Sequence, residues 1–197
     1  VNICNIGDLT CFSFHPRKLL TSGEGGMICT SNNTYAETLT IKLMHGAIVI
    51  DGKWNFVDYG FNYRLPEIQC MMLIKQLKKL DNIIDDRVRI HEYYKDELED
   101  YGFKAQMYST ESVHNMQSIV FTVPENVDRD ALIGYLKSNN IEAVLGTYCL
   151  SNCEYYRKKY SDVQENALWL QENTISLPCY DAVDTQTVID TIKNYLG

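Results

Sequence analysis

Lys18 is the residue of this sequence whose type and setting best fit covalent chemistry. The apolar run Cys11–Phe14 and Pro16 precede it, and Leu19–Leu20 and the glycine-rich turn at 23–26 follow it. Burial among apolar neighbours disfavours the ammonium form of a lysine, and an uncharged amine can attack a carbonyl to form a Schiff base. An isolated lysine is normally a solvated surface residue, so the case for this chemistry depends on the setting.

Two short strands joined by a long loop must position Lys18. The runs 11–14 and 27–30 are β-prone, and Pro16 and a Ser-Gly-Glu-Gly-Gly turn separate them. A helix is expected next, with Asn33 as its N-cap and a stop at Gly46. Residues 47–61 carry Gly, Asp, Trp and Tyr without a period, which predicts a loop.

A long helical pattern divides the chain. Over residues 66–101 the apolar residues recur at intervals of three and four, which predicts one long helix or two nearly continuous ones. Helices of this length often bridge two lobes. We therefore expect a domain boundary near Asp81, with residues 1–80 in one domain and residues 81–197 in the other.

The second part of the chain alternates strands with helices. Asp128 is a candidate helix cap. The order of elements predicts a small two-layer α/β sandwich with helices on one face of a short sheet. Strands are expected at 117–123, 141–145 and 175–177, and helices at 128–138, 162–173 and 184–196.

The composition excludes several classes of partner. With 45% apolar and 22% charged residues, the 197-residue chain can bury a core. The net charge of −8, without a cluster of lysines and arginines, argues against nucleic acid and membranes as partners. Seven cysteines at irregular spacing, including Cys149 and Cys153 without a nearby histidine, fit neither a disulfide framework nor a zinc site. We expect no metal and a cytoplasmic location.

Three segments together resemble one protein family. Residues 12–30 (FSFHPRKLLTSGEGGMICT), 59–81 (YGFNYRLPEIQCMMLIKQLKKLD) and 175–196 (ISLPCYDAVDTQTVIDTIKNYL) are similar to the lysine region, the second signature and the C-terminal ending of the DegT/DnrJ/EryC1/StrS family of pyridoxal-phosphate sugar aminotransferases. The resemblance implies an α/β fold, the C-terminal half of a fold-type-I, aspartate aminotransferase-like enzyme. Residues 1–80 would then be the C-terminal portion of the large cofactor-binding domain, and residues 81–197 the small α/β domain.

The resemblance also implies the roles of five site residues. Lys18 stands where the family's lysine bonds covalently to C4′ of pyridoxal 5′-phosphate. Ser13 stands where a hydroxyl contacts the cofactor phosphate, and Asn62 where an amide reaches that phosphate from the neighbouring subunit of a homodimer. Tyr63 and Arg64 would line the cofactor or sugar pocket. The residues alone leave other roles open. Ser13 could be a strand hydroxyl that bonds locally, and Asn62 a turn residue with left-handed φ. Arg64 could form an ordinary ion pair with Glu67.

A member of this family would carry out a ping-pong transamination, with the cofactor as electron sink and the lysine moving the proton. Glutamate or glutamine would donate the amino group, and a nucleotide-linked keto-sugar of polysaccharide or secondary-metabolite biosynthesis would accept it. Lys18 argues against the family's dehydratase branch, where another residue replaces the lysine. Glu24 would either orient the lysine loop or remain an exposed turn carboxylate.

The sequence departs from the family in length. Family members are roughly twice as long, and the half without a counterpart before Val1 normally holds the aspartate paired with the pyridine nitrogen, the stacking aromatic residue and the phosphate-binding turn. We expect a fragment of a longer enzyme, or the product of a split or truncated gene, that is inactive alone and exposes apolar surface. The alternative is a non-catalytic truncated paralogue that serves dimerisation or regulation.

Overall fold

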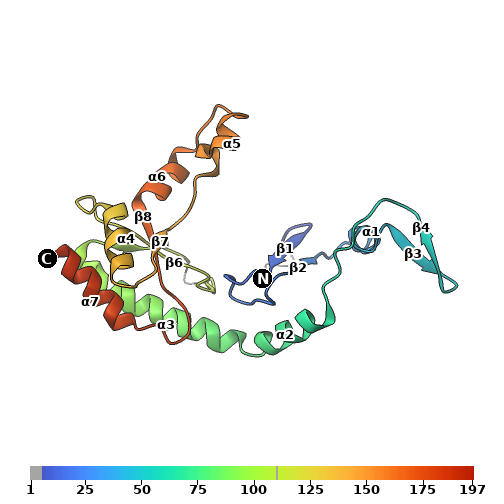
Figure 1. Ribbon diagram of the computed structural model, residues 1–197, viewed down its shortest axis with the longest axis horizontal. Coiled ribbons are helices and arrows are strands. Elements are labelled where there is room, and N and C mark those ends of the chain that lie inside the picture. The colour runs from blue at the N-terminus through green and yellow to red at the C-terminus, as the bar shows by residue number, and fades with distance from the viewer. Residues whose placement is uncertain (1–5, 110) are drawn as a thin grey trace. The chain divides into compact units, whose positions relative to one another are not determined.

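Two short antiparallel strands carry the lysine loop. The computed structural model describes residues 6–109 and 111–197, and in it β1 (Thr10–Ser13) pairs with β2 (Gly26–Cys29) (Figure 1). Both strands lie within one residue of their predicted positions. Past the last pair, the Phe14 N–H donates to the Gly25 carbonyl at 2.9 Å. Residues 14–25 therefore form a loop that is closed at its base.

Helix α1 (Asn33–Leu43) follows β2, and its N-cap is Asn32. The Asn32 side chain accepts the N–H groups of Thr34 and Tyr35 at 2.9 and 3.3 Å. The prediction of Asn33 as the cap was wrong by one residue. Two adjacent asparagines both offer a suitable acceptor, and only the extended backbone at the first one distinguishes them.

The segment predicted as a loop begins as a β-hairpin. β3 (Ala47–Ile50) pairs with β4 (Lys53–Phe56) around Asp51 and Gly52, whose φ angles are 49° and 73°. Two successive positive φ angles are those of a type I′ turn, which matches the twist of the flanking strands. The prediction was wrong because it relied on the absence of a helical period. It overlooked the Asp-Gly pair between β-prone residues, which favours a hairpin.

The long helical pattern forms two helices, α2 (Glu67–Leu77) and α3 (Leu80–Leu98). Between them the Lys79 N–H donates to the Gln76 carbonyl at 2.8 Å, a tighter 3₁₀-type bond that ends the first helix. This confirms the alternative of two nearly continuous helices. The chain divides into two compact units, residues 1–80 and 81–197.

The second unit contains an antiparallel sheet in the order β5-β6-β8-β7. Its helix α4 begins as predicted, because the Asp128 side chain accepts the N–H groups of Asp130 and Ala131 at 3.0 and 2.9 Å. The strands predicted at 117–123 and 141–145 are shorter in the structure, and the one predicted at 175–177 begins one residue earlier. The sequence reading missed the two-residue edge strand at Lys104–Ala105. The elements are η2 (Glu99–Tyr101), β5 (Lys104–Ala105), β6 (Ile119–Thr122), α4 (Arg129–Ser138), β7 (Val144–Leu145), η3 (Leu150–Asn152), α5 (Glu154–Arg157), α6 (Glu165–Asn173), β8 (Thr174–Leu177) and α7 (Thr185–Leu196).

One face of this sheet forms the core of the second unit. Along β6, Ile119 and Phe121 are buried whereas Val120 and Thr122 are half-buried, as expected for a strand with one covered face. The Tyr94 hydroxyl of α3 donates to a backbone carbonyl at 3.1 Å, and burial raises the pKa of Tyr94. The predicted two-layer sandwich is confirmed. Its core consists of Tyr94, Leu98, Phe103, Met116, Ile119, Phe121, Leu132, Leu136, Ile141, Ala143, Ile175, Leu177, Val188, Ile189 and Ile192.

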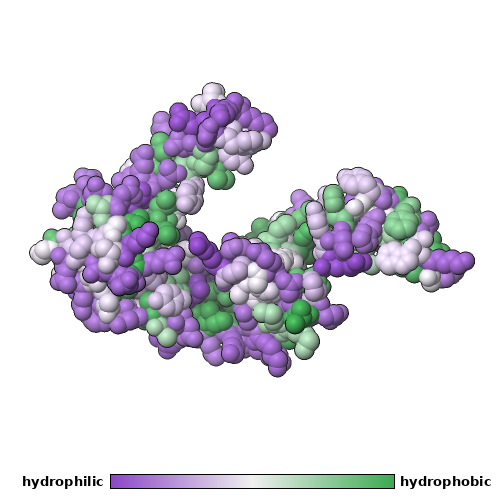
Figure 2. Space-filling model, in the orientation of Figure 1, coloured by the Kyte–Doolittle hydropathy of each residue, from purple (hydrophilic) through white to green (hydrophobic). Residues whose placement is uncertain are grey.

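The first unit leaves much apolar surface uncovered. Of its described residues, Phe14, Ser22, Gly46 and Ala47 are buried. Figure 2 shows apolar residues at the surface, as expected for sheet and helix faces that lack a covering layer. No helix of the described residues is long and apolar enough to span a membrane. The exposed apolar side chains include Phe12, Met27, Ile28, Val49, Ile50, Trp54, Phe56, Ile68, Met71, Ile74 and Leu77.

Candidate functional site

Lys18 lies on the loop between β1 and β2, on a well-defined turn. The Lys18 N–H donates to the His15 carbonyl at 2.9 Å, and Pro16 occupies the second position of this turn, which its fixed φ favours. The Arg17 N–H donates to Nδ1 of His15 at 3.2 Å. The Lys18 side chain is exposed, and its amine has no hydrogen-bond or ion-pair partner among the described residues. The turn fixes the backbone and leaves the amine available.

The described residues do not bury the Lys18 amine. Phe14 is buried and Leu19 and Leu20 are half-buried, so the apolar neighbours shield the base of the loop but not its tip. The dry pocket expected from the sequence is therefore not formed by this part of the chain. A covering layer would have to come from other polypeptide.

The segment after Lys18 is fixed by hydrogen bonds within the loop. The Thr21 hydroxyl and the Ser22 N–H both donate to the Phe14 carbonyl, at 2.9 and 3.2 Å, and the buried Ser22 hydroxyl donates to the Glu24 carbonyl at 2.8 Å. Gly25 has a φ of 143°, and a Cβ there would lie 2.7 Å from the Leu65 side chain. Only glycine fits this position without displacing its neighbours.

Ser13 ends β1 opposite Gly26 and already makes a local bond. Its Oγ accepts the His15 N–H at 3.3 Å, so the local role left open by the sequence is present. The hydroxyl hydrogen can still be donated to an anion, since accepting one bond does not use it. The exposed Glu24 carboxylate lies 3.9 Å from Nε2 of His15, at the outer limit of an ion pair and of little energetic consequence.

Asn62 lies in a segment that is fixed to the end of α1. Met44 and Asn62 form an antiparallel bridge, the Tyr63 N–H donates to the Leu43 carbonyl at 3.2 Å, and the Phe61 N–H donates to the Lys42 carbonyl at 2.7 Å. Asn62 does not have the left-handed φ that its alternative role as a turn residue would require. Its side chain is exposed, so its amide is available to a ligand or a second chain.

An ion pair braces the segment that carries Asn62. Nζ of Lys42 lies 2.7 Å from Oδ2 of Asp58 and 3.2 Å from the centre of the Tyr59 ring. The Lys42 hydrogen bond, with that of the Tyr59 N–H, lowers the pKa of Asp58. Partial burial acts to lower the pKa of Lys42, but its hydrogen bond and attraction to Asp58 outweigh this effect and raise it.

We expect this segment to loosen in acid. Because the folded-state pKa of Asp58 is lowered, the pair stabilises the segment above the ordinary pKa of an aspartate, and this contribution is lost as the pH falls through the lowered value. The raised pKa of Lys42 places the corresponding loss above the ordinary lysine range. Amide exchange of residues 42–63, corrected for intrinsic rates, should differ between wild type and Asp58→Asn at neutral pH and converge in acid. A difference that does not depend on pH would contradict the assignment.

Gly46 sets the close approach between the end of α1 and the Asn62 segment. Its φ is 77°, and a Cβ at this position would overlap the backbone of Asp58. The Gly46 carbonyl accepts the N–H groups of Val57 and Asp58 at 2.9 and 3.1 Å. Gly46→Ala should therefore displace the segment and destabilise it locally by at least about 2 kcal/mol, measured by amide exchange of residues 42–63.

Gly52 provides a matched control for this substitution. It has a similar φ of 73°, but a Cβ there meets no atom within 4 Å. Gly52→Ala should thus incur only the backbone cost, on the order of 1 kcal/mol. Equal losses of exchange protection in both variants would mean that the overlap with Asp58 is relieved without consequence.

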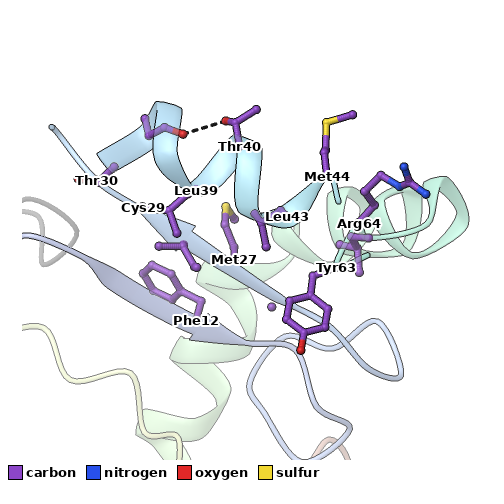
Figure 3. Close-up of a pocket in the computed structure, with 14 residues that line it drawn as sticks. Phe12, Met27, Cys29, Thr30, Leu39, Thr40, Leu43, Met44, Tyr63 and Arg64 are labelled. Carbon is purple, nitrogen blue, oxygen red and sulfur yellow. Dashed lines mark hydrogen bonds between the residues drawn. The ribbon is translucent and has the colours of Figure 1, made fainter. Parts of the chain in front are cut away.

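A groove of about 900 Å³ lies between the β1–β2 pair and α1 (Figure 3). Tyr63 and Arg64 line it, and Figure 3 shows the Tyr63 ring and the Arg64 side chain pointing in different directions. The Tyr63 ring stacks on Phe61 with a centroid distance of 5.0 Å. The described residues do not form the Arg64–Glu67 ion pair considered from the sequence. Most of the remaining lining is apolar: Phe12, Met27, Ile28, Ala36, Leu39, Leu43, Met44 and Leu65.

The five predicted site residues are thus only partly brought together. Tyr63 and Arg64 share the groove, whereas Ser13, Lys18 and Asn62 do not line it.

The second unit contains the cysteine pair considered from the sequence. Sγ of Cys149 lies 3.2 Å from the Ser151 hydroxyl, and the described residues gather no group of three or more metal-ligating side chains.

Comparison with known proteins gives consistent matches along the chain. Residues 1–195 match the DegT/DnrJ/EryC1/StrS aminotransferase family. The UDP-4-amino-4,6-dideoxy-N-acetyl-beta-L-altrosamine transaminase of Campylobacter jejuni is 30% identical, over 96% of this chain and 52% of its own length. The GDP-perosamine synthase of Vibrio cholerae is 27% identical, over 97% of this chain and 53% of its own length.

A solved structure shows the same fold. PseC of Helicobacter pylori, an aminotransferase involved in the biosynthesis of pseudoaminic acid, superposes with a TM-score of 0.90 at 20% identity. The superposition covers 98% of this chain and 54% of PseC, so the chain spans about half the length of the proteins that it matches. The predicted fold, the C-terminal half of a fold-type-I enzyme, is confirmed. This chain belongs to the DegT/DnrJ/EryC1/StrS aminotransferase family.

Proposed function

We propose that this chain supplies the lysine-bearing half of a pyridoxal-phosphate-dependent aminotransferase that acts on nucleotide-linked sugars. The observation that carries the proposal is an exposed amine, that of Lys18, on a loop whose backbone is fixed on both sides. Residues 1–80 would be the end of the large cofactor-binding domain, and residues 81–197 the small domain. The names of the relatives, a UDP-sugar transaminase and a GDP-perosamine synthase, support a nucleotide-linked substrate.

The residues of the first unit fit pyridoxal phosphate. When bound, this cofactor supplies an aldehyde that bonds to a lysine and a ring that accepts electrons. Lys18 offers the amine, while Ser13 offers a hydroxyl hydrogen and Asn62 an exposed amide for the phosphate. Asn62 would act from the neighbouring subunit of a homodimer. Tyr63 and Arg64 would contact the cofactor or sugar from the groove.

Lys18 would also move the proton in the reaction. Its Nζ would take the proton from the α-carbon of the amino donor, glutamate or glutamine, and would return a proton when the keto-sugar is aminated. Nζ must be uncharged at that moment, which requires surroundings without bulk water. The described residues leave Lys18 exposed, so activity would need further polypeptide to cover it. This polypeptide would be equivalent to the half of the relatives that this chain does not match.

The cysteines of the described residues support a reducing cytoplasm as the location. Among them, Cys11, Cys70, Cys149, Cys153 and Cys179 have free thiols. Disulfides are rare in that compartment, where thiols are kept reduced.

A reconstitution experiment tests the proposal. The 197-residue chain and a chain extended by the upstream coding region are each mixed with pyridoxal phosphate, and the visible absorption band of the bound cofactor is recorded. Amino transfer from glutamate to a nucleotide-linked keto-sugar is assayed in parallel. We expect the activity, and a band that persists after unbound pyridoxal phosphate is removed, with the extended protein and neither with the 197-residue chain. An extended protein without the band would refute the enzymatic function and favour a role in dimerisation or regulation.

A further inference from the structure

Two glutamines of α2 reach the loop that carries Lys18. Nε2 of Gln69 donates to the carbonyls of Glu24 and Ser22 at 2.9 and 3.2 Å, and Oε1 of Gln76 accepts the N–H of Thr21 at 2.9 Å. Seven residues separate the two glutamines, so two turns of the helix place them on the same face. Both are half-buried, while Lys75 beside them is exposed. We call Gln69 and Gln76 the glutamine clamp.

The clamp ties together parts of the chain that lie far apart in sequence. Thr21 and Gln76 are separated by 55 residues, and Glu24 and Gln69 by 45. Lys18 lies between two fixed points, Phe14 at the base of the loop and Thr21 at the helix. A short segment held at both ends has few conformations, so the bonds at its far end limit where the amine can be.

We propose that Gln69 and Gln76 are positioning residues for Lys18, which hold the loop against α2 so that the amine is presented at one place. Within the part of the chain that the structure describes, neither glutamine bonds to the Lys18 side chain, so their effect passes through the backbone at Thr21, Ser22 and Glu24. The catalytic importance of this positioning rests on the proposed function. The positioning itself rests on the three hydrogen bonds.

The two glutamines use opposite ends of their amides, which predicts opposite responses to one substitution. Gln76 provides an acceptor, and Gln76→Glu keeps an oxygen for the Thr21 N–H. Gln69 provides a donor, and Gln69→Glu removes it and sets a carboxylate against the carbonyls of Ser22 and Glu24. Glutamate and glutamine have nearly the same shape. A side chain that only fills space would therefore respond alike at both positions.

Amide hydrogen exchange of the 197-residue chain tests the clamp directly. In Gln69→Glu, the amides of residues 14 and 21–23 should exchange at least about tenfold faster than in wild type, whereas in Gln76→Glu they should stay within about twofold. Gln76→Leu, which removes the acceptor, should accelerate the Thr21 amide. Lys75→Gln lowers the net charge by one on the same helix, as both glutamate variants do, and should have no effect. Equal acceleration in the two glutamate variants, or none in either, would overturn the proposal.

A second readout follows Lys18 itself. The chain is treated with pyridoxal phosphate, the resulting imines are reduced with borohydride, and the labelling of Lys18 relative to Lys75 is measured by peptide mass spectrometry. This ratio should change at least about threefold in Gln69→Glu and be retained in Gln76→Glu, because only the first variant loses its bonds. An unchanged ratio in Gln69→Glu would mean that the clamp does not position Lys18. A missing absorption band in the extended protein would refute the proposed function. It would not affect amide exchange or Lys18 labelling, because both are measured on the 197-residue chain.

Discussion

Replacing Lys18 with alanine in the extended, cofactor-loaded protein should abolish the visible absorption band and lower kcat by at least about 10³-fold. Alanine has no amine to bond to the cofactor and none to move a proton at the α-carbon of the donor. The neighbours do not provide a substitute. Arg17 carries a guanidinium, which has hydrogen-bond donors and no acceptor, and Nδ1 of His15 accepts the Arg17 N–H. Absorption spectra and amino-transfer rates measure the two effects.

Lys75 gives the control for this experiment, because it is an exposed lysine of the same unit that lies on a helix and not on the loop. Lys75→Ala should keep the band and the rate. Addition of a small primary amine should restore part of the activity of Lys18→Ala, since it replaces the missing proton acceptor. A band that persists in Lys18→Ala would show that another group holds the cofactor.

The strands around Lys18 could be predicted because their signals are local. Short β-prone runs, a proline and a glycine-rich turn determine β1, β2 and the loop between them within one residue. The β3–β4 hairpin carried an equally local signal in Asp51 and Gly52, which a search for helical period passes over. The choice of Asn32 over Asn33 as the cap depends on backbone geometry that the residue types do not determine.

The setting of the site was harder to predict because it depends on contacts distant in sequence. The apolar neighbours of Lys18 predicted a dry pocket, but burial needs a covering layer that no local pattern describes. The glutamine clamp was missed for the same reason. Its signal is nonetheless present in the sequence, as two amides seven residues apart on a stretch of α2 that, apart from Lys75, is apolar between them. Where such amides are half-buried, as Gln69 and Gln76 are, they need hydrogen-bond partners.

Truncation of Phe121 to alanine should destabilise the second unit by about 3–5 kcal/mol. Phe121 is 1% exposed and lies in β6 between its cross-strand neighbours Ala105 in β5 and Ile175 in β8. The ring of His91 on α3 stacks near it, with a centroid distance of 6.1 Å. Removal of the Phe121 ring leaves a cavity between the sheet and α3, which these elements cannot fully close. Since domains of this size are stable by only about 5–15 kcal/mol, urea unfolding should show a large loss.

Val120 is the matched control, because it neighbours Phe121 on the same strand but points to the other face. It is half-buried, and Val120→Ala should cost less than about 1.5 kcal/mol. The contrast between the two variants measures how one-sided the sheet is. If both cost the same, both faces of β6 contribute equally to stability, and the second unit is not the two-layer sandwich whose helices cover a single face.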